Sequence, residues 1–290
     1  MQNRYCRGQR TFVQRGVAMR ELLHTGVRSV FLSDLHLGTR SCQAENLLHF
    51  LEQTSFQQLF LLGDIVDLLA MSRQSYWPTQ HGRILKTIMK KARAGVQIML
   101  IPGNHDCALR QFRHWRHENI QIQHEHVYTT AAGKRYWLIH GDRFDHQMTL
   151  SPALEWLGDK LNDGLVSLQS WVNARRRRQQ KASVQFTRRI KERTPAARRY
   201  IEQFSSVVIN ATREKACDGV ICGHIHYPQS LHDQGVHYLN TGDWVESRSA
   251  IVESHDGRLH LLDQIEQRLR AGDEQRPSML AATTIEPVRI

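Results

Sequence analysis

The sequence predicts an α/β fold in which two β-sheets lie face to face and helices cover both outer faces. Two observations support this prediction. In the first half, apolar runs of strand length alternate with amphipathic helical runs, which is the βαβαβ pattern of a parallel or mixed sheet layered by helices. In the second half, several short strand-like runs indicate a second sheet. The expected fold class is therefore a four-layer α-β-β-α sandwich with a helical cap insertion.

The first half supplies the alternating pattern. The expected elements are strands at 27–32, 59–62 and 96–101 and helices at 45–53 and 82–93. The first strand ends in Val30, Phe31 and Leu32, a continuous apolar run that is typical of a strand buried on both faces. Gly63 follows the second strand and permits a sharp turn there.

The second half supplies shorter strands. They are expected at 120–130, 135–139, 219–222, 237–239, 250–253 and 258–262. Gly133 and Gly257 lie in the turns of two predicted hairpins.

An insert at about 146–216 separates these strands. Apolar residues recur every three or four positions from Leu154 to Val172 and predict an amphipathic helix, which four consecutive arginines follow. A second helix is expected to begin at Pro195. Residues 145–215 hold fourteen Lys or Arg against seven Asp or Glu. We expect a folded domain at 25–265, with a disordered basic leader (1–24) and a polar tail (266–290).

Composition limits the partners and the compartment. The net charge of +11 and the pI of 9.8 imply an anionic partner, which is a nucleic acid, a membrane surface or a phosphorylated substrate. No apolar run approaches the roughly 18 residues of a membrane span. The five cysteines are odd in number and show no CxxC spacing, which favours a reduced, cytoplasmic protein.

Polar turns follow five of the apolar runs. Ser33-Asp34-Leu35-His36-Leu37-Gly38 comes directly after the first strand. The others are Gly63-Asp64-Ile65-Val66-Asp67, Gly103-Asn104-His105-Asp106, His140-Gly141-Asp142 and Gly223-His224-Ile225-His226. Sites in α/β sheets gather at the carboxyl ends of strands, so we expect these turns to meet.

Seven residues in these turns are candidate metal ligands: Asp34, His36, Asp64, Asn104, His140, His224 and His226. Mixed oxygen and imidazole ligands suit Mn, Fe, Zn or Ni better than Ca or Mg. Seven ligands exceed the needs of one ion but suit two ions that share a carboxylate. Two ions about 3.5–4 Å apart can hold a bridging hydroxide and clamp a phosphoryl group for in-line attack.

These five motifs, in this order, resemble those of the calcineurin-like metallophosphoesterase superfamily from about Val27 to Leu262. The resemblance implies one ion held by Asp34, His36, Asp64 and His226, and a second held by Asp64, Asn104, His140 and His224. It also implies that His105 protonates the leaving group and that Asp67 orients His105. The implied cofactors are two divalent ions, with Mn preferred over Fe, Zn, Ni or Mg.

Within this superfamily the chain is similar to the UDP-2,3-diacylglucosamine pyrophosphatases of lipid A synthesis. The first motif, the runs Gly223–Pro228 and Asn240–Trp244, and the helical insert after His140 carry this resemblance. In the family, a helical cap receives the acyl chains. The chain departs from the family at His105, where Arg is usual, and at Asp67, where Glu is usual, which favours a sister branch.

The resemblance implies a hydrolase that cleaves a pyrophosphate or phosphoester bond in a nucleotide-linked lipid. The alternatives are a phosphodiesterase or nucleotidase for soluble nucleotides and a binding module without catalysis, which the complete ligand set disfavours. Arg40 is a candidate phosphate contact. The basic insert suits contact with the cytoplasmic face of the inner membrane. Nucleic acid is a weaker candidate partner, because no recognition motif is present.

Overall fold

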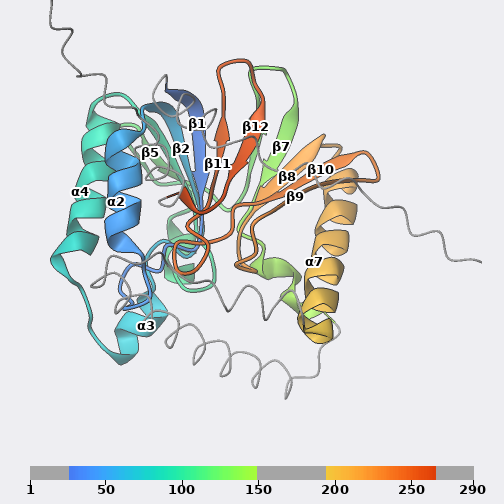
Figure 1. Cartoon of the computed structure of the whole chain (residues 1–290). Coiled ribbons are helices and arrows are strands. Elements are labelled where there is room, and N and C mark those ends of the chain that lie inside the picture. The colour runs from blue at the N-terminus through green and yellow to red at the C-terminus, as the bar shows by residue number, and fades with distance from the viewer. Residues whose placement is uncertain (1–25, 149–193, 266–290) are drawn as a thin grey trace, which may run out of the picture.

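Two β-sheets lie face to face in the computed structural model, which describes residues 26–148 and 194–265 (Figure 1). Helices α2 (Ala44–Gln53) and α4 (Thr79–Arg93) cover the outer face of one sheet, and α7 (Pro195–Glu214) covers the outer face of the other. The predicted four-layer α-β-β-α sandwich is confirmed.

The first sheet has seven strands in the order β12-β11-β1-β2-β3-β5-β4. Their bounds are β1 Val27–Leu32, β2 Phe56–Leu62, β3 Gln97–Ile101, β4 Arg116–His117, β5 Ile120–Ile122, β11 Ala250–Glu253 and β12 Leu259–Leu262. Strands β1, β2, β3 and β5 run parallel, whereas β4, β11 and β12 pair antiparallel with their neighbours. The centre of this sheet is therefore the predicted parallel βαβαβ unit.

The second sheet has five strands in the order β6-β7-β8-β10-β9. Their bounds are β6 His126–Thr129, β7 Arg135–Leu138, β8 Gly219–Cys222, β9 Gln229–Asp233 and β10 Val236–Asn240. Strands β7, β8 and β10 run parallel, so that their carboxyl ends lie at one edge.

Apolar side chains fill all three spaces between the four layers. Between the sheets, Phe31 stacks on Phe60 with ring centroids 4.8 Å apart, and Tyr128 from the second sheet meets both rings edge-on. Behind the first sheet, the apolar faces of α2 and α4 pack on β1 and β2. Behind the second sheet, Phe204 and Val208 of α7 pack on β8 and β10. Each helix thus buries most of the apolar stripe that its sequence period predicted, although Met89 of α4 is exposed.

Several predicted boundaries were wrong. The single strand expected at 120–130 is two strands, because β5 belongs to the first sheet and β6 to the second. The residues of β5 and β6 have similar strand propensity, so the sequence does not show where the chain passes from one sheet to the other. Short elements were also missed: α3 (Leu68–Arg73), β4, β9 and the 3₁₀ helices η1 (Cys107–Phe112) and η2 (Asp142–Gln147).

Other expectations fall outside the described residues, namely the leader, the tail, the helix at 154–172 and the four arginines after it. The division into leader, domain, insert and tail stays a prediction. The second helix of the insert is α7, and it begins at Pro195 as expected. No helix in the described ranges has the length and apolar character that a membrane span requires. The four cysteines within those ranges are free thiols.

Candidate metal centre

The five polar turns meet at one edge of the two sheets. The parallel strands β1, β2 and β3 of the first sheet and β7 and β8 of the second each lead into one of them. Backbone bonds join the turns within each sheet, from Asp34 N to Gly63 O (3.0 Å) and from Gly223 N to His140 O (2.9 Å). A bond from His224 N to Asp34 Oδ2 (3.0 Å) joins the turns of the two sheets. The fold therefore brings together turns that lie almost 200 residues apart in sequence.

The backbone is strained at five of the seven predicted ligands. Asp34, His36, Asp64, His224 and His226 have φ values between 48° and 73°. Residues other than glycine seldom adopt this left-handed conformation, which costs on the order of 1–3 kcal/mol each. Such strain persists only where the surrounding structure enforces it, and it concentrates at functional sites.

One group of potential ligands consists of Asp34, His36 and His226, whose ligand atoms lie within 4.8 Å of one another. His226 Nε2 is 3.2 Å from Asp34 Oδ1 and 3.3 Å from His36 Nε2. Burial opposes ionisation of Asp34, but the nearby His226 lowers the pKa of Asp34 to about 2. The group is thus built around a buried carboxylate that stays ionised. It contains three of the four residues that the resemblance implies for one ion.

A second group consists of Asp34, Asp64 and His140. His140 Nε2 lies 3.3 Å from Asp64 Oδ2 and 3.1 Å from Asn104 Oδ1. His140 Nδ1 donates to the carbonyl oxygen of Leu62 at 2.8 Å, which leaves the Nε2 lone pair directed at the other ligands. Burial opposes ionisation of Asp64, but His140 holds the pKa of Asp64 well below its usual value. Three of the four residues implied for the second ion therefore lie together.

Asp67 holds two histidines at once. Its Oδ2 lies 2.9 Å from His36 Nδ1, and its Oδ1 lies 2.9 Å from His105 Nδ1. The resemblance implied only the second contact. The first contact directs His36 Nε2 toward Asp34 and Asp64. Asp67 also accepts from Ala70 N at 2.7 Å and thereby caps α3.

His105 lies closer to the ligands than expected. Its ring is 4.7 Å from the ring of His36, edge to face, and its ligand atom falls within 4.8 Å of those of His36 and Asp64. Burial opposes the charged form of His105, but Asp67 outweighs burial and raises the pKa of His105. The pKa values of His36 and His140 are raised as well, so the role of His105 as an acid stays a prediction, with which its contact with Asp67 agrees.

Asp106 is a positioning residue that the sequence did not reveal. Its carboxylate accepts from Gly103 N (2.6 Å), Ile65 N (2.8 Å) and Asp64 N (3.3 Å), and thus ties the second turn to the third. It is fully buried. An acidic residue directly after His105 was the available signal, but an acid in a turn is ordinarily solvated.

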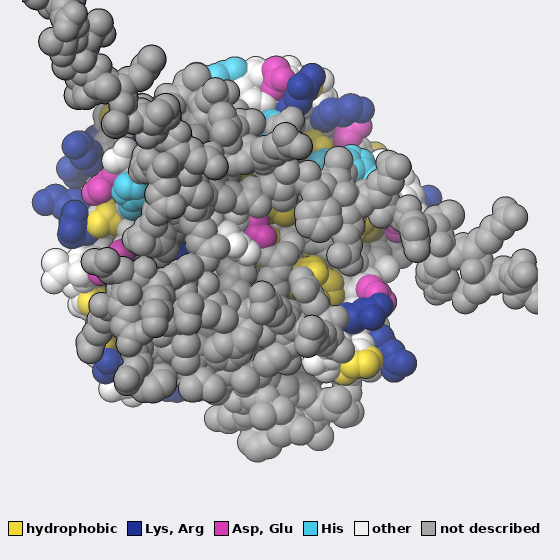
Figure 2. Space-filling view, in the orientation of Figure 1, with side chains coloured by type: hydrophobic (Ala, Val, Ile, Leu, Met, Phe, Trp, Pro, Cys, Tyr) yellow, Lys and Arg dark blue, Asp and Glu magenta, His cyan; other side chains and the backbone are white. Residues whose placement is uncertain are grey.

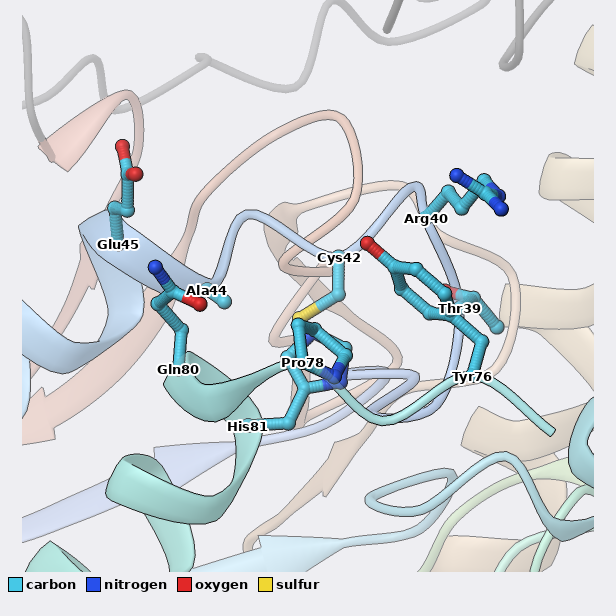
Figure 3. A pocket seen from close by; sticks show the side chains of 9 residues that line it. All are labelled: Thr39, Arg40, Cys42, Ala44, Glu45, Tyr76, Pro78, Gln80 and His81. Carbon is cyan, nitrogen blue, oxygen red and sulfur yellow. The ribbon is translucent and has the colours of Figure 1, made fainter.

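Two further predicted site residues, His224 and Arg40, lie outside the two groups of potential metal ligands. His224 Nε2 lies 2.7 Å from Asp145 Oδ1, and His224 belongs to neither ligand group, although its ring is 5.1 Å from that of His140. Arg40 lies over the ring of Tyr76 at 4.7 Å and lines a separate cavity of about 180 Å³ (Figure 3).

Two residues that flank the turns have structural contacts. Asp142 forms no side-chain cap at the start of η2 and pairs with Arg110 at 2.5 Å. Trp244 is fully buried and packs on Phe50 with ring centroids 5.4 Å apart.

The side chains fit a pair of divalent ions. Asp34 Oδ1 is buried and lies 3.2 Å from His226 Nε2 without hydrogen-bond geometry, an arrangement that costs free energy unless a cation satisfies the oxygen. Glycine is required at position 103, because a Cβ there would collide with Asp64 Oδ1 and His140 Nε2. The ion-pair contacts of Asp34 and Asp64 are with histidines. Oxygen and imidazole atoms around two ionised carboxylates form a donor set suited to Mn, Fe or Zn.

The fold and the site together define a metal-dependent phosphoester hydrolase. The family model for calcineurin-like phosphoesterases matches residues 27–228, and the chain belongs to that family. The match includes all the turns described above.

Comparison with individual proteins adds little beyond the family. No curated protein matches the sequence. Similar solved structures include a novel archaeal phosphodiesterase (13% identity, 81% of this chain and 98% of that one, TM-score 0.42) and the phosphoesterase Yfce from E. coli (15%, 81% and 97%, 0.37). Another is Vps29 from Entamoeba histolytica complexed with Zn (12%, 81% and 98%, 0.38).

Proposed function

We propose that this phosphoesterase cleaves the pyrophosphate bond of a nucleotide-linked lipid resembling UDP-diacylglucosamine. The observation that carries the chemistry is the convergence of Asp34, His36, Asp64, His140 and His226 in strained turns at one sheet edge. When bound, two divalent ions at this edge would supply Lewis-acid stabilisation of the phosphoryl group and activation of a water molecule.

The side chains have distinct roles in the proposed reaction. The Asp34 and Asp64 carboxylates hold the ions and stay ionised because histidines surround them. His105, whose pKa is raised by Asp67 against the effect of burial, donates a proton to the leaving phosphate oxygen. Asp67 also fixes the ring of His36, so one carboxylate serves both metal binding and proton transfer.

The lipid part of the proposal is supported by sequence resemblance and by the surface. Phe112 and Trp115 expose 47% and 44% of their surface, and Arg113 and Arg116 lie beside them in the stretch that directly follows the His105 turn. Arginine with exposed aromatic rings suits an anionic membrane interface. Figure 2 shows Lys and Arg side chains, with Asp and Glu among them, along both flanks of the face in view. These features support contact with the cytoplasmic side of the membrane, as proposed for the basic insert.

The cavity beside Arg40 favours a second candidate, hydrolysis of a soluble nucleotide or phosphodiester. Arg40 and Tyr76 lie side by side at its rim, opposite the Glu45 end of α2 (Figure 3). The loop that bears Arg40 also holds His36, and Gly38 N in that loop donates to His81 Nδ1 at 2.9 Å. An aromatic ring and a guanidinium in a cavity on the loop that holds His36 suit a base and a phosphate.

Replacing Arg40 with alanine tests whether this cavity binds substrate. We expect KM to rise about five- to tenfold with kcat nearly unchanged, because the lost contact would be worth about 1–1.5 kcal/mol in both ground state and transition state. Steady-state kinetics measure both constants. Arg83→Ala is the control, because Arg83 is exposed and pairs only weakly with Glu52 at 3.7 Å. Equal KM values for both variants would rule out substrate binding by Arg40.

The substrate class is tested by assaying UDP-diacylglucosamine beside linear and cyclic nucleotides, each with added Mn²⁺. We expect kcat/KM to be highest for the lipid-linked pyrophosphate. The same assay without the acyl chains measures the contribution of the lipid. Turnover confined to the soluble compounds would replace the first candidate with the second.

A further inference from the structure

The metal ligand predicted at His224 differs from the others in the nitrogen that it offers. His36 and His140 each direct Nδ1 at an oxygen, from Asp67 and from the carbonyl of Leu62 respectively, and so keep Nε2 for an ion. In His224 the contact is reversed, because Nε2 lies 2.7 Å from Asp145 Oδ1. An ionised carboxylate can only accept, so Nε2 carries the proton and Nδ1 keeps the lone pair.

The surroundings of His224 hold its ring in this orientation. The ring of Phe204 in α7 lies 6.0 Å from it, and that of His140 lies 5.1 Å from it. Gly141 leaves the space that these rings need, because a Cβ there would come within 2.9 Å of Phe204 and 3.3 Å of the His224 Cβ. Its aromatic neighbours thus favour the orientation in which the His224 ring meets Asp145.

The backbone of Asp145 is also held in place, while its side chain is about half exposed. It lies in η2, where Met148 N donates to its carbonyl oxygen at 2.9 Å. Phe144, its neighbour, is buried and packs edge-on against Trp137 at 6.2 Å and Phe204 at 6.5 Å. These contacts anchor η2 in the apolar layer beneath α7 and present Asp145 to the solvent side of His224.

We propose that Asp145 is a positioning residue of the metal centre, which fixes the tautomer and orientation of His224 so that Nδ1 binds one of the two ions. This inference rests on the proposed metal-dependent function. Elements η2 and α7 lie at the two ends of the insert. The proposal gives them a role in metal binding, in addition to any role in substrate recognition. Carboxylates that orient a ligating histidine commonly strengthen metal binding by 10–100-fold.

Mn²⁺ titration of the metal-free chain, followed by calorimetry, tests the proposal without reference to activity. We expect the native chain to bind two ions. Asp145→Asn, which is isosteric, and Asp145→Ala should each weaken one of the two sites by about 10–100-fold and leave the other unchanged. The matched control is Glu125→Gln, which removes a half-exposed carboxylate that pairs with Arg143 and Lys215.

Nitrogen NMR of the His224 ring in the metal-free protein gives a second readout. The native chain should show Nε2–H, and Asp145→Ala should show a mixture of tautomers. Native-like Mn²⁺ affinity in both variants, or tighter binding because Asp145 competes with the ion, would overturn the proposal. A native chain that binds no Mn²⁺ would overturn the proposed function as well, whereas failure to hydrolyse the lipid with two bound ions would overturn only the substrate assignment.

Discussion

Replacing Asp64 with alanine should lower kcat/KM by ~10³-fold or more. Asp64 Oδ2 lies 3.3 Å from His140 Nε2 and 3.9 Å from His36 Nε2, so it stands between the two groups of ligands. Its loss would remove the shared ligand of both ions, and the Lewis-acid stabilisation that they supply is worth several kcal/mol. Hydrolysis of a generic phosphodiester at saturating Mn²⁺ measures the effect.

Two controls separate this effect from misfolding. Asp256→Ala removes an exposed carboxylate from the β11–β12 turn and should retain native activity. Thermal unfolding of Asp64→Ala without metal should show a cooperative transition, because the variant also removes a charge that is costly to bury. An Asp64→Ala protein that folds and turns over phosphodiester at the native rate would contradict a shared metal ligand at this position.

Replacing His105 with alanine should lower kcat by about 10²–10⁴-fold for substrates with a poor leaving group, which is the usual contribution of general acid catalysis. The loss should be much smaller for p-nitrophenyl esters, because p-nitrophenolate leaves without a proton. Comparison of the two substrate types therefore isolates proton transfer from metal binding. Equal losses on both types would assign His105 to the metal and not to the leaving group.

The role of His105 as an acid also predicts how activity changes with pH. His105 acts as an acid only while it is protonated, so activity should fall as the pH rises through the pKa of His105. The carboxylate of Asp67 raises that pKa. Asp67→Asn removes the negative charge and should therefore move the basic limb of kcat/KM to lower pH. Metal content must be measured in parallel, since Asp67 also contacts His36. A basic limb at an unchanged pH would contradict the role of Asp67.

The sequence predicted the strand-end positions of the site well, because each polar turn directly follows a run of apolar residues. Parallel strands then placed Asp34, Asp64 and Asn104 at one edge. Hydrophobic period also located α2, α4 and α7 to within a few residues. Local sequence therefore decided both the central sheet and the ligand positions in it.

The contacts that orient the ligands were not predictable in this way. Asp106 ties two turns together and Asp145 meets His224, yet both follow from how distant segments pack. The double role of Asp67 likewise depends on two histidines that lie 69 residues apart in sequence. The division of 120–130 between two sheets has the same origin, because strand propensity does not encode the partner strand.

Anomalous diffraction from crystals grown with Mn²⁺ tests the two-ion centre most directly. We expect two peaks about 3.5–4 Å apart at the carboxyl ends of β1, β2, β7 and β8. Asp64 should contact both peaks, with Asp34, His36 and His226 around one and Asn104, His140 and His224 around the other. A single peak, or two peaks that do not share Asp64, would contradict the proposed centre.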